Sequence, residues 1–110
     1  MLEKFASWQG NLENLIYEAT KISAEFSLNS DSEISVRMVR DYIQRGILGE
    51  VDKSGRELEF NYSHLLKLVL SRVLLQDGWS LRKIAEHFDF ADLEELEELF
   101  PNDDNLALST

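Results

Sequence analysis

Apolar residues recur at helical spacing in the first half of the chain, and polar turns separate the resulting segments. The pattern predicts a helix of about sixteen residues from Asn11, and a second helix of about ten residues between Ser35 and Gly46, which cap its two ends. The small polar residues 27–33 are predicted to form the loop between the two helices. On the second helix, the predicted packed stripe comprises Val36, Val39 and Ile43.

The second half of the chain predicts a hairpin and three further helices. Apolar and polar residues alternate on both sides of the turn residues 53–55, which is typical of two short strands. Ser63 is the predicted cap of a helix that ends at Gln76, and its apolar positions cover more than one stripe, so burial on two sides is expected. Ser80 caps the next helix, and a short amphipathic helix follows before Pro101.

These elements predict a fold that is mainly α with a small two-stranded wing, that is, a winged helix-turn-helix. With 110 residues, of which 44% are hydrophobic, the chain suits one small domain. Three parts are predicted along it. Residues 1–33 form an N-terminal helix region and turn that is a candidate dimerisation element, residues 34–88 form the winged-helix core, and residues 89–110 form a short acidic helix with a disordered tail.

Arginines occupy the polar side of the second helix. Arg37, Arg40 and Arg45 lie there together with Asp41 and Gln44. Guanidinium groups pair with guanine edges and with phosphates, and a short capped helix with such a face is typical of helix-turn-helix recognition elements. Duplex DNA is therefore the first partner to test, and a merely solvated helix face is an equally weighted alternative from this segment alone.

Composition argues against several other functions. The chain has no cysteine, and its two histidines, His64 and His87, stand far apart without a ligand-like pattern, so no metal site or cofactor is predicted. Neither histidine has a partner at a spacing typical of acid–base or nucleophilic catalysis, so the protein is not expected to be an enzyme. No stretch resembles a membrane span or a signal peptide, which predicts a cytoplasmic protein without membrane contact.

The net charge of −10 is unevenly distributed along the chain. By residue counts, the net charge is −3 over residues 1–32, +1 over residues 33–88 and −8 over residues 89–110. The acidity therefore lies mainly in the C-terminal segment, and nearly all the positive charge lies in the predicted winged-helix core. We expect modest, strongly salt-dependent affinity for DNA.

Three motifs, in this order, resemble the winged-helix domain of MerR-type transcriptional regulators over about residues 12–88. ISVRMVRDYIQRGIL is similar to the recognition-helix pattern of that family, GRELEFNYSHLLKL to its wing followed by a leucine-rich helix, and DGWSLRKIAEHF to its Leu-Gly-Phe-Ser-Leu segment. The resemblance implies a sequence-specific DNA-binding regulator. The predicted DNA contacts are Ser35, Arg37, Met38, Arg40 and Tyr42 on the helix and Lys53 and Arg56 on the wing.

The chain departs from the family pattern at several places. Asp41 stands where the family often has an aromatic residue, and Arg56 is displaced by about two positions relative to the wing aromatic. The chain offers no counterpart of the long dimerisation helix and effector domain, so the resemblance implies a simple repressor or an architectural binder, and not a metal- or drug-responsive activator. A homodimer is expected, with an interface formed by N-terminal apolar residues, namely Leu2, Phe5, Trp8, Leu12, Leu15 and Ile16. Short proteins of this type also resemble regulators that accompany mobile elements, including CRISPR-associated transposons.

A protein-interaction adaptor is the alternative function. Such a protein would keep the winged-helix scaffold and use its acidic ends to bind another protein. The glutamates at 94–98 are expected to be a solvated helix face, and their alternative roles are to fold onto the basic surface or to bind a protein partner. Convergence of Arg37, Arg40 and Arg56 on one exposed surface would favour DNA binding, whereas neutralisation by carboxylates would favour the adaptor.

Overall fold

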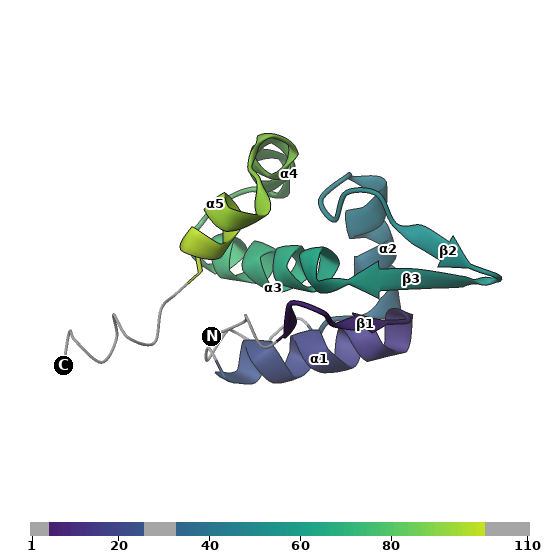
Figure 1. The fold of residues 1–110 in the computed structure, drawn as a ribbon. Helices are drawn as coiled ribbons and strands as arrows, with labels where there is room; N and C mark the ends of the chain where they lie inside the picture. Colours follow the sequence, from purple (N-terminus) through teal and green to yellow (C-terminus); the bar gives the residue numbers. More distant parts are fainter. Residues whose placement is uncertain (1–4, 26–32, 101–110) are drawn as a thin grey trace.

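The computed structural model describes residues 5–25 and 33–100, which form five helices and a small antiparallel sheet (Figure 1). This confirms the mainly helical fold with a wing. The predicted loop at 27–33, except Glu33, and the predicted tail after Phe100 lie outside the described residues. In chain order the elements are β1 (Gln9–Gly10), α1 (Leu12–Glu25), α2 (Val36–Gln44), β2 (Asp52–Ser54), β3 (Glu57–Asn61), α3 (Tyr62–Gln76), α4 (Leu81–Phe90) and α5 (Leu93–Glu98).

Both predicted caps of α2 are confirmed. The Ser35 Oγ accepts a hydrogen bond from the Met38 backbone N–H at 3.1 Å, which satisfies one of the free amides of the first turn. At the other end Gly46 has a φ of +81°, and the next amide, that of Ile47, donates to the Tyr42 carbonyl at 3.0 Å. This is a Schellman arrangement. It requires a left-handed backbone at Gly46, which glycine adopts easily because it lacks a Cβ. The helix therefore has fixed ends.

The start of α3 differs from the prediction, because Asn61 and not Ser63 is the cap. Strand β3 continues directly into the helix, so Asn61 is the last residue with extended backbone and Ser63 already lies in the first turn. The Asn61 side chain accepts from the His64 N–H, and the His64 Nδ1 accepts from the Asn61 N–H at 3.0 Å. The two residues form a reciprocal capping box.

The predicted hairpin is present, and a third strand is added to it. Strands β2 and β3 pair with Ser54 opposite Glu57, so the two-residue turn is Gly55-Arg56, shifted slightly from the predicted 53–55. Gly55 has a φ of +67°, as tight hairpin turns require. On the other side of β3, strand β1 pairs antiparallel, in the order β1-β3-β2. The wing is thus anchored to the residues that precede α1.

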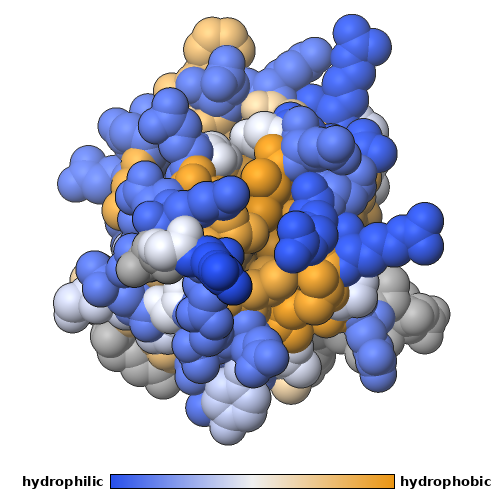
Figure 2. Space-filling view, turned by 90° about the vertical axis from the view of Figure 1, so that its right-hand side faces the viewer, coloured by the Kyte–Doolittle hydropathy of each residue, from blue (hydrophilic) through white to orange (hydrophobic). Residues whose placement is uncertain are grey.

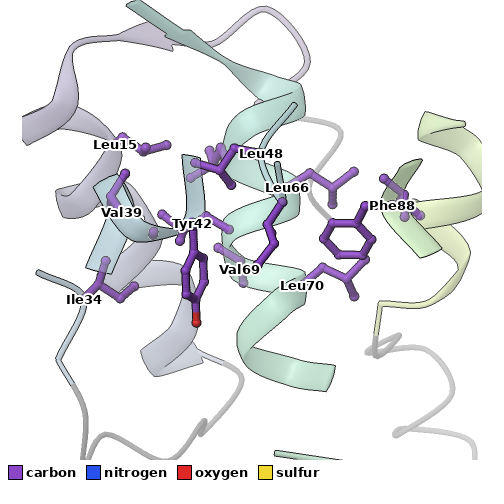
Figure 3. Close-up of a cluster of buried hydrophobic side chains, with 14 of the residues drawn as sticks. Leu15, Ile34, Val39, Tyr42, Leu48, Leu66, Val69, Leu70 and Phe88 are labelled. Carbon is purple, nitrogen blue, oxygen red and sulfur yellow. The ribbon is translucent and has the colours of Figure 1, made fainter. Parts of the chain in front are cut away.

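Helix α3 lies at the centre of the hydrophobic core. Its residues Leu66, Val69 and Leu70 are fully buried, and helices α1, α4 and α5 all pack against it. This confirms the predicted burial of the long helix on more than one side. Figure 3 shows side chains from α1, α2 and α4 converging on α3, among them Leu15, Val39, Tyr42 and Phe88.

The acidic helix α5 packs on α3. Leu96 is fully buried, and the Tyr62 hydroxyl donates a hydrogen bond to the Glu97 Oε2 at 2.6 Å. The predicted boundary between residues 88 and 89 falls inside α4, which runs to Phe90. Helix α5 therefore shares the core of the preceding helices.

Candidate nucleic-acid interface

One face of α2 is exposed and polar. Arg37, Arg40 and Gln44 are exposed there, because successive turns of the helix place them opposite the buried Val39. These residues line one groove together with Leu58 of β3, and the other lining residues are Val36, Asp41 and Ile43. Figure 2 views the molecule from the wing side and shows hydrophobic surface framed by hydrophilic side chains. The groove therefore combines cationic groups with an apolar floor.

The cationic side chains of this face are not neutralised by the part of the chain that the structure describes. Within residues 5–25 and 33–100, neither Arg37 nor Arg40 forms an ion pair. The carboxylate of Asp41, which lines the same groove, is bound by the Arg45 Nε at 2.9 Å. Pairing with Arg45, at the C-terminal end of α2, thus offsets this negative charge and leaves the two arginines available for a polyanion.

The wing carries the other two predicted cationic contacts. Lys53 lies on β2 and Arg56 in the hairpin turn, and both are exposed and have no ion pair with any described residue. Arg56 is not among the residues that line the groove, so the groove unites Arg37 and Arg40 but not Arg56. The hairpin extends away from the helices in Figure 1, as a backbone-contacting wing requires.

The structure corrects the predicted role of Tyr42. Its side chain is only 4% exposed, because it follows Val39 by three residues and faces α3 with it. Burial raises the pKa of its hydroxyl, an effect that the nearby Arg72 opposes. Tyr42 is therefore a core residue and not part of the exposed face.

The two remaining predicted contacts lie at the margin of that face. Met38 is half-buried, and its Sδ lies 3.7 Å from the Arg72 Nη1. Ser35 is exposed, but its Oγ already caps α2. In this structure both residues support the helix that carries the arginines.

Five groove residues were absent from the predicted contact set, namely Val36, Asp41, Ile43, Gln44 and Leu58. Gln44 lies two turns after Arg37 on the same face, and helical periodicity alone was a sufficient signal to include it. Val36 was predicted to pack in the core, which is wrong: its side chain is 45% exposed. The buried side of this short helix is centred on Val39 and Tyr42, and Val36 lies at its margin toward the wing.

His64 connects the base of the wing to α3. It is 5% exposed, its Nε2–H donates to the Glu50 carbonyl at 2.6 Å, and its ring meets the edge of Phe60 at a centroid distance of 5.5 Å. Burial lowers the pKa of this imidazole, and the nearby Lys67 lowers it further. The neutral ring is thus the form that holds the residues before β2 against the start of α3.

The residues of the predicted N-terminal dimer interface that the structure describes pack within the subunit. Leu15 is fully buried, so it cannot contact a second copy. Leu2 lies outside the described residues. The other four residues are partly buried against the core, namely Phe5, Trp8, Leu12 and Ile16.

The described glutamates of the C-terminal segment are not on the α2 groove. They belong to α5, which packs on α3, and none of them lines the groove. In Figure 1 the hairpin projects from one side of the molecule, and α4 and α5 lie toward the other. In this structure α5 therefore does not cover the arginines.

No group of three or more His, Cys, Asp or Glu side chains in residues 5–25 and 33–100 is arranged to hold a metal ion. Within the same ranges, every helix is too short or too polar to cross a membrane.

Comparison with known proteins identifies the family. The sequence pattern of the MerR HTH family of regulatory proteins matches residues 27–91, which is more than half of the chain. The match includes α2, the hairpin, α3 and α4, which are the elements that form and support the arginine face. Searches of curated proteins and of solved structures returned no match. The chain therefore belongs to the MerR helix-turn-helix family and is a DNA-binding regulator of transcription.

Proposed function

We propose that this protein is a sequence-specific repressor that places α2 in the major groove of duplex DNA. The observation that carries the proposal is the exposed face of Arg37, Arg40 and Gln44, which no carboxylate of the described chain neutralises. The width of the major groove admits an α-helix, both ends of α2 are capped, and its exposed face is supported from behind by α3.

Each group has a role that follows from its chemistry. The guanidinium groups of Arg37 and Arg40 each donate two hydrogen bonds to the O6 and N7 of guanine, and the Gln44 amide matches the N6 and N7 of adenine. Lys53 and Arg56 bind phosphates beside the site, which positions the helix without reading sequence. Because the protein carries a net charge of −10, long-range attraction to DNA is weak and binding relies on these local contacts.

Repression follows from occupancy in this proposal. The protein binds as a homodimer to two half-sites related by two-fold symmetry, and occupancy of the site rises with its concentration. The mass of the protein–DNA complex, measured by light scattering with increasing protein, tests this arrangement. A single copy on every duplex at all concentrations would contradict the dimer.

The test of DNA recognition is selection from randomised duplexes at about 0.15 M salt, where non-specific phosphate attraction is already weakened. Wild type is compared with the Arg37→Ala, Arg40→Ala double variant. Arg82→Ala is the matched control, because Arg82 is an exposed arginine of α4 that pairs with Glu86 and does not line the groove. We expect wild type and control to enrich one motif and the double variant to lose it. No enrichment by wild type would refute the proposal.

Quantitative binding separates base contacts from phosphate contacts. Each arginine substitution should cost about 1 to 3 kcal/mol on the selected duplex and little on random DNA. Lys53→Ala should weaken both duplexes alike and reduce the slope of log Kd against log salt by about one. Equal losses from the arginine variants on both duplexes would reassign Arg37 and Arg40 to phosphates.

A protein-binding adaptor is the second candidate, and a different surface favours it. Phe90 is 87% exposed at the end of α4, and Leu93 and Leu99 of the adjacent segment are also exposed among acidic residues. In a reporter assay, the adaptor predicts that Phe90→Ser abolishes regulation while the double arginine variant retains it. The DNA-binding proposal predicts loss in the arginine variant.

A further inference from the structure

An apolar strip separates the recognition face of α2 from the wing. It consists of Val36 and Ile43 on α2 and Leu58 on β3, and all three line the groove that also holds Arg37 and Arg40. Val36 is 45% exposed, while Ile43 and Leu58 are half-buried. A helix face built for phosphates alone would need no apolar surface at this position.

The surroundings of the strip restrict what can cover it. The positive charges of Arg37 and Arg40 favour an anionic occupant. The carboxylate of Asp41 does not repel such an occupant, because it is already bound by the Arg45 Nε at 2.9 Å. The occupant must therefore present an apolar group close to negative charge. In the major groove of DNA that group is the C5 methyl of thymine, which lies beside the base edges and near the phosphate backbone.

We propose that the strip formed by Val36, Ile43 and Leu58 reads thymine methyl groups on the wing side of the site. This inference rests on the proposed function and deepens it, because it assigns a base preference to residues that make no hydrogen bonds. Val36 is the main determinant, since it is the most exposed member of the strip. The arginines select guanine, and the strip requires thymine at adjacent positions.

The experiment removes the methyl group from the DNA without altering its hydrogen bonding. In the duplex obtained by the selection, each thymine is replaced in turn by uracil, and the Kd is measured for wild type, Val36→Ala and Val36→Thr. Leu93→Ala is the matched control, because it shortens an exposed apolar residue of α5, outside the groove. Circular dichroism confirms that each variant is folded.

We expect at least one uracil substitution to weaken wild-type binding about fourfold, the factor that corresponds to burial of one methyl-sized group. Leu93→Ala should show the same loss. Val36→Ala should bind the thymine duplex more weakly and no longer distinguish it from the uracil duplex. Val36→Thr should discriminate less than wild type, because a hydroxyl replaces one of the two methyl groups of valine and the other remains.

Three results would overturn the inference. The first is that wild type binds every uracil duplex as tightly as the thymine duplex, and the second is that Val36→Ala still binds the uracil duplex more weakly. The third is that the selected motif contains no thymine. Each result would remove the proposed role of the strip and leave DNA recognition intact. If a protein segment covers the strip instead, the first of these results is expected. Failure to enrich any duplex would refute the proposed function itself, and this inference with it.

Discussion

Replacement of His64 by alanine should destabilise the fold by about 3 kcal/mol at pH 7.5. The substitution removes the Nε2–H hydrogen bond to the Glu50 carbonyl at 2.6 Å and the Nδ1 acceptor of the Asn61 amide at 3.0 Å. Each such bond contributes about 1 kcal/mol, and the edge-on contact with Phe60 adds roughly another. Urea denaturation followed by circular dichroism measures the change in the free energy of unfolding.

The same residue should make stability depend on pH. Burial lowers the pKa of His64 in the folded protein, whereas the unfolded chain has a pKa of about 6.5. Below that pH the unfolded chain therefore binds a proton that the folded protein does not, so the stabilisation is present above pH 6.5 and is lost as the pH falls. Protonation of Nδ1 would also remove the acceptor for the Asn61 amide.

The comparison of variants isolates this effect. Between pH 7.5 and 5.5, wild type and His87→Gln should lose stability, and His64→Ala should lose less than wild type. His87→Gln removes the other histidine of the chain and so serves as the control. Equal losses of unfolding free energy in wild type and His64→Ala would refute the assigned role of the buried imidazole. The same holds if His64→Ala costs less than about 1 kcal/mol at pH 7.5, which is the value of a single hydrogen bond.

Four further substitutions test other parts of the fold by the same denaturation assay. Ser35→Ala should cost about 1 kcal/mol by removing the cap of α2, and no loss would contradict the cap. Gly10→Ala should cost about 1 to 3 kcal/mol, because its Cβ would lie 2.6 Å from the Asn14 Cβ, and a neutral result would argue against β1 packing here. Leu96→Ala should cost about 2 to 5 kcal/mol and Leu93→Ala under about 1, and equal costs would contradict the packing of α5.

Helices with local start and stop signals were predictable from the sequence. The cap of α2 is formed by Ser35 and its end by Gly46, and Ser80 caps α4, because these signals act within a few residues. The exposed positions of Arg37 and Arg40 followed from helical periodicity in the same way. The hairpin was predictable because alternation and turn residues are also local.

The remaining features depend on tertiary contacts. Strand β1 has two residues and pairs with β3 some fifty positions later, so no local period reveals it. Asn61 became the cap of α3 because β3 runs into the helix without a loop. Tyr42 was expected to be exposed and is buried, whereas Val36 was expected to be buried and is exposed. A helix of nine residues presents only a narrow side to α3, and tertiary packing decides the orientation of that side.

The pairing of β1 with β3 also protects the chain against association through its sheet. Strand β2 lies along one side of β3, and β1 covers Phe60 and Asn61 on the other side, so the part of that edge left uncovered carries Glu57, Leu58 and Glu59. Short edge strands offer few unpaired amide and carbonyl groups to another chain. A shortened chain that starts at Asn11 would uncover the β3 edge at the buried Phe60, and would be more prone to associate through its sheet for a reason unrelated to the stability of its helices.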